Sequence, residues 1–320
     1  MNWDSVDWSA LERLRGAFLA GNAGASDYWH GETDLASYDL TFAQRIGWKW
    51  DWVLDDLKTN GWRPPSGELL DWGCGTGIAH RAFLQHFGVD SITQLHLWDR
   101  SNPAMRFAVD RIRSKYPNLN TRTGITESPA LLLISHVLTE LSPEQATQLA
   151  DFARQAHTVI WVEPGTYEAS LALIAVRERL RPDFNCIAPC THQRKCGILA
   201  AANERHWCHH FAKPPNNVFT DGNWARFGAM MGIDLRSLPL SYLVLDKRPS
   251  PLKPGATRII GRPRVYKPHA LILGCDDCSV CEHRLDKRSC PEAFKQLKRD
   301  RFESLQWWTS QAGVIAKIES

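Results

Sequence analysis

The feature that most constrains this chain is a glycine-rich turn that joins a short apolar strand to a helix. Residues Asp71–Gly77 read D-x-G-x-G-x-G and directly follow the apolar pair Leu69 and Leu70. Glycine lets the backbone turn tightly and approach a ligand, because it has no Cβ. The dinucleotide fingerprint G-x-G-x-x-G does not fit, since position 78 is Ile. The turn therefore predicts a ligand-binding α/β sheet, and a glycine-rich turn of some other doubly wound protein remains the alternative.

The chain around this turn alternates short apolar strands with helical stretches, which predicts a parallel sheet covered on both faces. Helical periodicity before residue 62 and a basic, Pro-rich composition after Pro249 suggest three regions. These are a helical region over 1–62, the α/β domain over 63–246 with a cysteine-rich insertion at about 184–212, and a basic β extension over 247–320. We expect one strand pair near Arg258–Leu273 and a final helix, from about Pro291, that closes the chain. Further strands are expected at Leu69–Trp72, Leu95–Asp99, Leu131–Ser135, Thr158–Glu163 and Leu238–Asp246.

Positive charge is concentrated toward the end of the chain. The net charge of the 320 residues is +3, but Lys247–Arg301 holds 14 Lys/Arg against 6 Asp/Glu, a balance of +8. Such a segment suggests a polyanionic partner, RNA above all, with Lys247–Lys267 contacting phosphates. A solvated basic face without a partner is the alternative.

Neither a secretory signal nor an apolar run long enough to cross a bilayer is visible, so the sequence predicts a cytoplasmic protein without a membrane partner. In a reducing compartment, nine cysteines indicate metal or redox chemistry rather than disulfides. Eight of them form two groups. Cys186, Cys190, Cys196 and Cys208 follow C-x3-C-x5-C-x11-C, whereas Cys275, Cys278, Cys281 and Cys290 follow C-x2-C-x2-C-x8-C and precede Pro291.

The spacing of the second group is similar to the ligation pattern of ferredoxins. Four thiolates also suit a tetrahedral zinc ion, so the ligand count alone does not decide between zinc and an iron–sulfur cluster. The eight cysteines could form two four-ligand sites or one site drawn from both groups. Ordinary buried thiols are the remaining interpretation.

The glycine-rich turn resembles the first motif of S-adenosylmethionine (SAM) methyltransferases. In that family the acid two residues before the first glycine, here Asp71, holds the methionine end of the ligand. An acid at the end of the next strand, here Asp99, binds the ribose hydroxyls. The resemblance implies a SAM site made by Asp71, Gly73, Gly75, Gly77, Asp99, Ser135 and His136. The third strand lacks the Asn/Asp-Pro-Pro-aromatic run of amino-methylating enzymes, so no catalytic residue is assigned.

A wider set of motifs resembles the methyltransferase-like small-ribosomal-subunit assembly proteins of bacteria and mitochondria. The matching stretches are Tyr38–Trp50, Asp71–Gly77, Ser135–Leu141, Val162–Thr166, Ala188–His192 and Trp207–His209. This resemblance implies a seven-strand Rossmann-like methyltransferase fold, a [4Fe–4S] cluster and a role on the small ribosomal subunit in its assembly or in translation. It implies cluster ligands at Cys190, Cys196, Cys208 and Cys275.

Two functional hypotheses stay open at this point. The first is a SAM-dependent methyltransferase that acts on small-subunit ribosomal RNA. The second is an RNA-binding assembly factor that performs no chemistry and carries a structural or redox-sensing metal cluster. The additional cysteines Cys186, Cys278, Cys281 and Cys290 leave open whether one or two clusters are bound.

Overall fold

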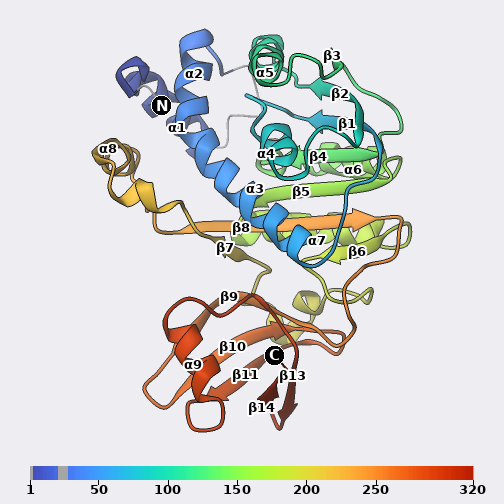
Figure 1. Ribbon diagram of the computed structural model, residues 1–320, viewed down its shortest axis with the longest axis vertical. Coiled ribbons are helices and arrows are strands. Elements are labelled where there is room, and N and C mark those ends of the chain that lie inside the picture. Colours follow the sequence, from blue (N-terminus) through green and yellow to red (C-terminus); the bar gives the residue numbers. More distant parts are fainter. Residues whose placement is uncertain (1–2, 21–27, 320) are drawn as a thin grey trace.

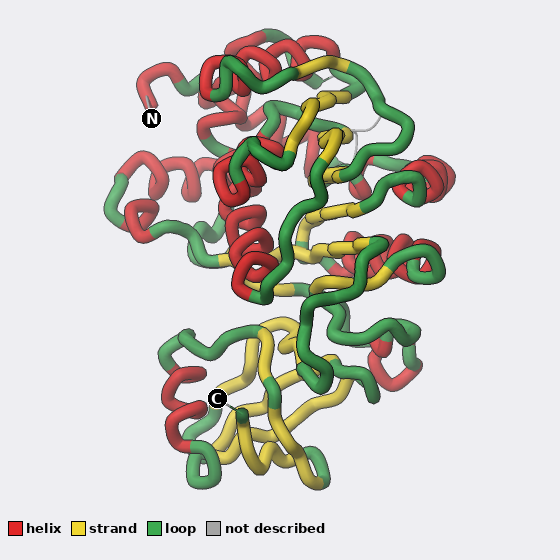
Figure 2. Tube along the Cα trace, turned by 45° about the vertical axis from the view of Figure 1, so that its right-hand side comes forward, coloured by secondary structure: helices red, strands yellow, loops and turns green. Residues whose placement is uncertain are grey.

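The computed structural model describes residues 3–20 and 28–319, and it shows a helix-covered sheet joined to a second, smaller sheet (Figure 1). In Figure 2 the helices gather around the first sheet, while the body that follows is built mainly of strands. The helices are α1 (Trp8–Leu19), α2 (Glu32–Leu40), α3 (Phe42–Thr59), α4 (Ile78–Phe87), α5 (Asn102–Lys115), α6 (Pro143–Ala153), α7 (Tyr167–Leu180), α8 (Gly222–Met231) and α9 (Pro291–Lys298).

The first sheet has the strand order β3-β2-β1-β4-β5-β8-β6, with β7 paired to β8. Strands β1 to β5 pair in parallel, whereas β8 runs antiparallel to both β5 and β6. Its strands are β1 (Gly67–Trp72), β2 (Ile92–Trp98), β3 (Thr121–Thr123), β4 (Leu131–Ser135), β5 (Thr158–Pro164), β6 (Asn185–Ala188), β7 (His210–Ala212) and β8 (Leu238–Asp246). One antiparallel strand inserted beside β5 is the arrangement of the SAM methyltransferase fold, so the predicted fold class is confirmed.

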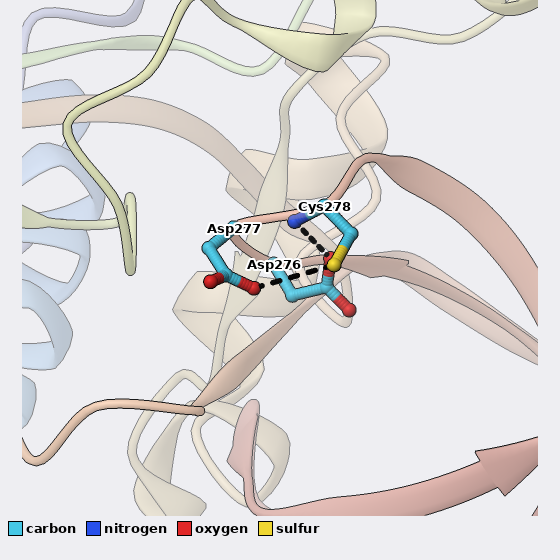
Figure 3. A group of neighbouring side chains, drawn as sticks. All are labelled: Asp276, Asp277 and Cys278. Carbon is cyan, nitrogen blue, oxygen red and sulfur yellow. Dashed lines mark hydrogen bonds between the residues drawn. The ribbon is translucent and has the colours of Figure 1, made fainter.

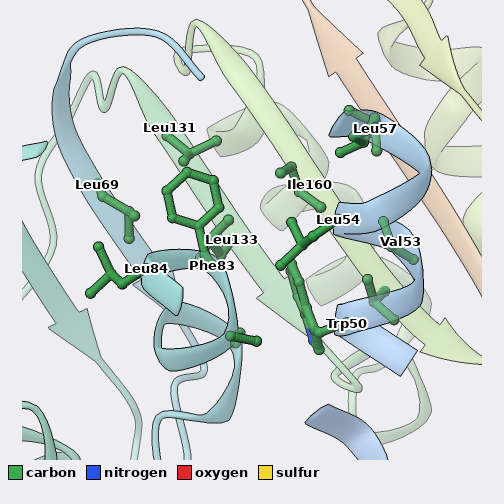
Figure 4. Close-up of a cluster of buried hydrophobic side chains, with 14 of the residues drawn as sticks. Trp50, Val53, Leu54, Leu57, Leu69, Phe83, Leu84, Leu131, Leu133 and Ile160 are labelled. Carbon is green, nitrogen blue, oxygen red and sulfur yellow. The ribbon is translucent and has the colours of Figure 1, made fainter. Parts of the chain in front are cut away.

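Side chains along the central strands alternate between two apolar layers, because successive residues of a strand point to opposite faces. Leu69, Leu131 and Leu133 pack against α3, α4 and α5, as Figure 4 shows for the contacts with α3 and α4. Leu70 and Leu132 face α6 and α7 on the other side. Both faces are therefore buried, which explains why these strands read as almost continuous apolar runs.

The second sheet follows at the C-terminal end and has the order β12-β9-β10-β11-β14-β13. Its strands are β9 (Thr257–Val265), β10 (His269–Cys275), β11 (Val280–Asp286), β12 (Leu305–Gln306), β13 (Trp308–Gln311) and β14 (Val314–Ile318). The pairing of β9 with β10 confirms the expected strand pair. The expectation that a helix closes the chain is wrong, because α9 is followed by β12, β13 and β14.

A buried ion pair connects the two sheets. Arg258 of β9 donates from Nη1 to Asp56 Oδ1 of α3 at 2.9 Å and from Nη2 to Asp56 Oδ2 at 3.0 Å. Its Nε donates to the carbonyl oxygen of Pro189, in the cysteine-rich insertion, at 3.1 Å. Arg258 is only 2% exposed, so this bidentate pair ties α3, the insertion and the second sheet together.

Candidate functional site

A cavity of about 490 Å³ opens beside the carboxyl ends of β1, β2 and β4. Ligands of doubly wound sheets bind at this edge. Five of the seven predicted SAM-site residues line the cavity; these are Gly73, Gly75, Asp99, Ser135 and His136. Among the residues that the structure describes, Asp71 and Gly77 are not part of its wall.

The glycine-rich turn forms one wall of this cavity. The backbone φ of Gly75 is +50°, and a Cβ added there would meet no atom within 4 Å. At Gly73, with φ +69°, an added Cβ would lie 2.9 Å from Val137 Cγ1. Gly73 is therefore required for packing, whereas the open space beside Gly75 is available to a ligand.

Asp71 is fully buried beneath the turn. Its Oδ2 lies 2.7 Å from Nδ1 of His80 and also accepts the backbone N–H of His80 at 3.3 Å. Asp71 therefore fixes the start of α4 against β1. Its other oxygen, Oδ1, is buried without a hydrogen-bond partner in the described part of the chain, and it does not reach the cavity. The predicted ligand contact of Asp71 is therefore absent in this arrangement, and its role is to support the turn.

Asp99 stands at the carboxyl end of β2, on the cavity wall. Its two oxygens accept the backbone N–H groups of Gly75 and Ser101, each at 2.8 Å. Burial raises the pKa of Asp99, and these two N–H donors oppose that shift. Each oxygen keeps a further lone pair, so the carboxylate can accept hydrogen bonds from a diol.

Ser135 and His136 close the cavity at the end of β4. The hydroxyl of Ser135 accepts Nε1–H of Trp50 at 2.9 Å. His136 has a φ of +56°, and its Nε2 is buried without a partner among the described residues. Burial lowers the pKa of His136 well below its usual value, and the nearby cations Lys49 and Arg45 lower it further. The ring is therefore neutral at pH 7 and can accept a proton or a hydrogen bond.

Beside His136 lies a buried carboxyl group that the sequence reasoning did not assign. Oε1 of Glu163, at the end of β5, accepts N–H of Val137 at 3.0 Å, N–H of Leu138 at 3.1 Å and the indole N–H of Trp161 at 2.7 Å. Burial raises the pKa of Glu163 to about 7, and burial also lowers the pKa of the neighbouring Lys49 to about 7. An acidic residue that ends an apolar strand was the available sequence signal.

We expect Glu163→Gln to change how stability depends on pH. In the unfolded chain this carboxyl ionises near its ordinary pKa, whereas the folded protein retains the proton until about pH 7. The wild type should therefore lose stability between pH 5 and pH 8, and the Gln variant should lose roughly 1–2 kcal/mol less over that interval. Urea unfolding of both proteins at the two pH values measures this difference. If the free energies of unfolding of the two proteins changed equally with pH, the raised pKa of Glu163 would be contradicted.

Three aromatic rings line the same cavity as the glycine-rich turn, and the sequence did not predict them as site residues. Tyr28, Trp29 and Tyr38 line the cavity, with ring centroids 4.7 Å apart for Tyr28 and Trp29 and 5.2 Å apart for Trp29 and Tyr38. Burial raises the pKa of the adjacent Glu140 to about 7, while its ion pair with Arg100 at 3.3 Å lowers it. These rings offer flat apolar surfaces against which a planar base can stack.

The cysteines predicted as cluster ligands come together at the junction of the two sheets. Cys190, Cys196 and Cys208 belong to the insertion, and Cys275 ends β10. Burial raises the pKa of Cys275, and the thiols of Cys190, Cys208 and Cys196 raise it further. Apolar side chains surround the group; they are Ile174, Ile198, Ile260 and Val280.

The strand register separates Cys275 from the cysteines that follow it. Cys275 is paired with Val280 across β10 and β11, and Gly274 is paired with Cys281. Neighbouring pairs point to opposite faces, so Cys281 points away from Cys275. Cys290 packs in a different apolar cluster, beside α9. The structure therefore does not bring the four cysteines of the ferredoxin-like spacing together.

Cys278 lies in the exposed turn between β10 and β11, beside Asp276 and Asp277 (Figure 3). Its backbone N–H donates to Asp276 Oδ1 at 2.9 Å, and its thiol contacts Asp277 at 3.5 Å. Cys186 is buried against Cys190, and the hydrogen bond between them raises the pKa of Cys186 and lowers that of Cys190.

Within the described ranges, no helix combines the length and the apolar character that a bilayer crossing requires.

Comparisons with known proteins place this fold in a family. Similar solved structures include magnesium protoporphyrin IX methyltransferase from Synechocystis with bound SAM, at 11% identity and a TM-score of 0.41, covering 75% of this chain and 98% of that one. A SAM-dependent methyltransferase of Leishmania major has 12% identity and a TM-score of 0.37, covering 75% and 83%. One from Aquifex aeolicus has 14% identity and a TM-score of 0.33, covering 41% and 79%.

No curated protein matches the chain significantly. A protein-family profile described as mitochondrial small ribosomal subunit Rsm22 matches residues 52–304, which include the glycine-rich turn, the insertion and β10. The chain therefore belongs to the Rsm22 family of small ribosomal subunit proteins.

Proposed function

We propose that this protein binds SAM and methylates RNA of the small ribosomal subunit, and that it carries one [4Fe–4S] cluster on Cys190, Cys196, Cys208 and Cys275. The observation that carries the proposal is the cavity at the carboxyl ends of β1, β2 and β4. There the open turn at Gly75 lies beside the carboxylate of Asp99. The compartment proposed is the cytoplasm, as for bacterial small-subunit assembly proteins.

The cavity offers contacts for the ribose of SAM. Asp99 can accept the ribose hydroxyls and Gly75 leaves room for the ligand, whereas the buried Asp71 supports the turn from beneath. When bound, SAM supplies an electrophilic methyl group. The residues of the chain would hold acceptor and donor in line, which is the main source of rate in such a transfer.

His136 is the residue best placed to hold the acceptor base by a hydrogen bond. It lines the cavity, its Nε2 has no partner among the described residues, and burial keeps it neutral. The rings of Tyr28, Trp29 and Tyr38 on the facing wall can stack on the base. Because the Asn/Asp-Pro-Pro-aromatic run of amino-methylating enzymes is absent, we do not assign which atom of the base receives the methyl group.

The four proposed cysteine ligands are spaced more widely than the ligands of one zinc ion. Tetrahedral zinc with bonds of about 2.3 Å places its sulfur ligands roughly 3.8 Å apart. Among the described residues, three possible ligand atoms lie within 4.8 Å of one another only at Asp276, Asp277 and Cys278, so no three of the four thiols are that close. A void of about 30 Å³ lies between α7 and Cys190, Cys196 and Cys208, and Cys275 does not line it. The choice of a [4Fe–4S] cluster over zinc therefore depends on the family resemblance.

The basic segment contributes less free charge than its composition suggests. Of the seven Lys/Arg side chains of residues 247–267, four have carboxylate partners; these are Arg248, Lys253, Arg258 and Arg264. Arg262 instead lies over the ring of Phe211, 4.2 Å from the ring centroid, and Lys247 lies over the ring of Phe184 at 5.2 Å. A cation beside an aromatic ring suits contact with single-stranded RNA. We therefore propose RNA contacts at Lys247 and Arg262 rather than along the whole stretch.

Transfer of labelled methyl groups tests the proposed activity. Purified protein is incubated with methyl-labelled SAM and immature small-subunit particles, and His136→Ala serves as the impaired variant. The wild type should label the RNA, and the variant should be slower by roughly 10-fold, the effect of losing one hydrogen bond to the acceptor base. SAM binding without any transfer would instead identify a non-catalytic assembly factor.

A further inference from the structure

A buried guanidinium lies directly behind the cysteine group. Arg177 of α7 is 2% exposed, and its Nε donates to Sγ of Cys190 at 3.1 Å. Its Nη2 donates to the carbonyl oxygens of His192 at 3.3 Å and Arg194 at 2.9 Å. One side chain thus contacts a predicted ligand and holds the backbone of the loop that follows it.

The neighbouring residue of α7 extends this arrangement to a second ligand. Glu178 pairs with Arg177 through Nη1, and the same carboxylate oxygen, Oε1, accepts the backbone N–H of Cys196 at 3.0 Å. The pair therefore connects Cys190 and Cys196, two ligands of the insertion, to one turn of a helix that packs on the first sheet.

Charge explains why an arginine stands at this buried position. A buried cation is costly unless opposite charge surrounds it. Glu178 supplies one negative charge, which it shares between Arg177 and Arg181, and the other partners of Arg177 are two carbonyl oxygens and a sulfur. Four thiolates around a [4Fe–4S] cluster would supply the remaining negative charge.

We propose that Arg177 is a positioning residue for the metal cluster: it holds Cys190 toward the metal and stabilises the negative charge of the thiolate-bound cluster. This inference depends on the proposed cluster. Hydrogen bonds to cluster sulfurs and nearby charge set the reduction potential. Because reduction adds negative charge, the guanidinium of Arg177 raises that potential.

Arg181 provides a matched control on the same helix. Its Nη1 donates to the carbonyl oxygen of Gln193 at 3.3 Å, and its Nε pairs with Glu178 at 3.4 Å. It thus holds the same loop through the same acid, but neither of these contacts involves a cysteine. Comparing the two arginines separates support of the loop from support of the cluster.

The experiment compares wild type, Arg177→Gln, Arg177→Lys and Arg181→Gln, all purified and reconstituted without oxygen. We measure iron content, the rate at which a chelator removes the cluster, the midpoint potential and the thermal midpoints of the loaded and metal-free forms. Arg177→Gln should lose the cluster roughly 10- to 100-fold faster, as is typical for residues behind metal ligands. Its midpoint potential should also be lower.

Arg177→Lys keeps the charge but cannot make all four contacts, so it should fall between Arg177→Gln and wild type. Arg181→Gln should match the wild type within about twofold in both readouts. A general structural role would lower the thermal midpoints of loaded and metal-free Arg177 variants equally, whereas our proposal predicts that the loaded form loses more. If Arg177→Gln fails to fold, the chelator and potential measurements on Arg177→Lys decide.

The outcomes distinguish this inference from the proposed function. A wild type that takes up no iron under reconstitution overturns the cluster itself. A loaded wild type with equal cluster loss and potential in the Arg177 and Arg181 variants overturns the role of Arg177 and leaves the cluster intact.

Discussion

Cys275→Ser is expected to abolish binding of the proposed cluster, although Cys275 lies 67 positions after the nearest other ligand, Cys208. Three of the proposed thiolates belong to the insertion, and the fourth comes from β10 of the second sheet. Serine keeps the size of the side chain but does not provide the thiolate on which these clusters depend. Iron and sulfide analysis of protein purified without oxygen should fall from about four irons per chain to nearly none.

The same substitution should also weaken the connection between the two sheets. In the wild type the cluster would join the insertion to β10, in addition to the Arg258–Asp56 pair. Metal binding is coupled to folding when the ligands come from separate segments. The thermal midpoint of the loaded protein should therefore drop to that of the metal-free wild type, while metal-free wild type and variant should melt alike.

Cys290→Ser is the matched control, because Cys290 packs beside α9, in an apolar cluster that contains none of the four ligands. It should retain full iron content. If Cys290→Ser lost iron and Cys275→Ser retained it, the proposed ligand set would be wrong. Cys290 would then belong to a metal site that does not include Cys275. About eight irons per wild-type chain would likewise show a second cluster.

The parts of the fold that the sequence predicts are those where local pattern and tertiary role agree. The buried strands β1, β4 and β5 read as apolar runs because both of their faces are covered. The turn at Gly73 and Gly75 requires positive φ, so its glycines mark it in the sequence. No single segment of the sequence determines the order of the strands in the sheet. That order was expected only because of the family resemblance.

Strands β13 and β14 were missed because they are short and largely exposed at the end of the chain. Their stability comes from pairing with each other and with β11 rather than from a pattern of their own. The sequence predicted that the helix from about Pro291 closes the chain, and nothing local indicated that strands follow it.

Cavity residues that belong to a sequence motif could be named from the sequence, whereas residues whose role depends on burial could not. Asp99 follows a strand at the expected distance, and it lies on the cavity wall. Arg177 looks like an ordinary surface charge in the sequence, and the position of Glu163 at the end of an apolar strand is a weak signal. The two residues are nevertheless only 2% and 0% exposed. Their roles depend on what packs above them, and this information is spread over β4, β5, α7 and the insertion.

The spacing of Cys275, Cys278, Cys281 and Cys290 suggested a metal site that the fold does not form. Three cysteines at two-residue gaps suggest one metal site when they are considered alone. The antiparallel pairing of β10 with β11 places Cys275 and Cys281 on opposite faces of the hairpin. Strand register therefore decides which cysteines can meet, and register is a tertiary property.

Asp99→Ala should weaken SAM binding by roughly 30- to 100-fold, which corresponds to about 2–3 kcal/mol. The carboxylate lies on the cavity wall at the end of β2, where a charged acceptor can bind the two ribose hydroxyls. Hydrogen bonds to a charged group are stronger than neutral ones, and their loss leaves the ligand hydroxyls unpaired in a largely buried site. Isothermal titration of the purified variants with SAM measures the change in Kd.

Two further variants separate loss of ligand contact from damage to the turn. Asp99 also accepts the backbone N–H groups of Gly75 and Ser101, so alanine removes support from the glycine-rich turn as well. Asp99→Asn keeps an oxygen acceptor but removes the charge, and it should lose affinity by a smaller factor than alanine. Asp90→Ala changes an exposed acid just before β2 and should bind like the wild type. If all three variants bind SAM equally, the ribose does not lie at Asp99, and the cavity beside Gly75 holds some other ligand.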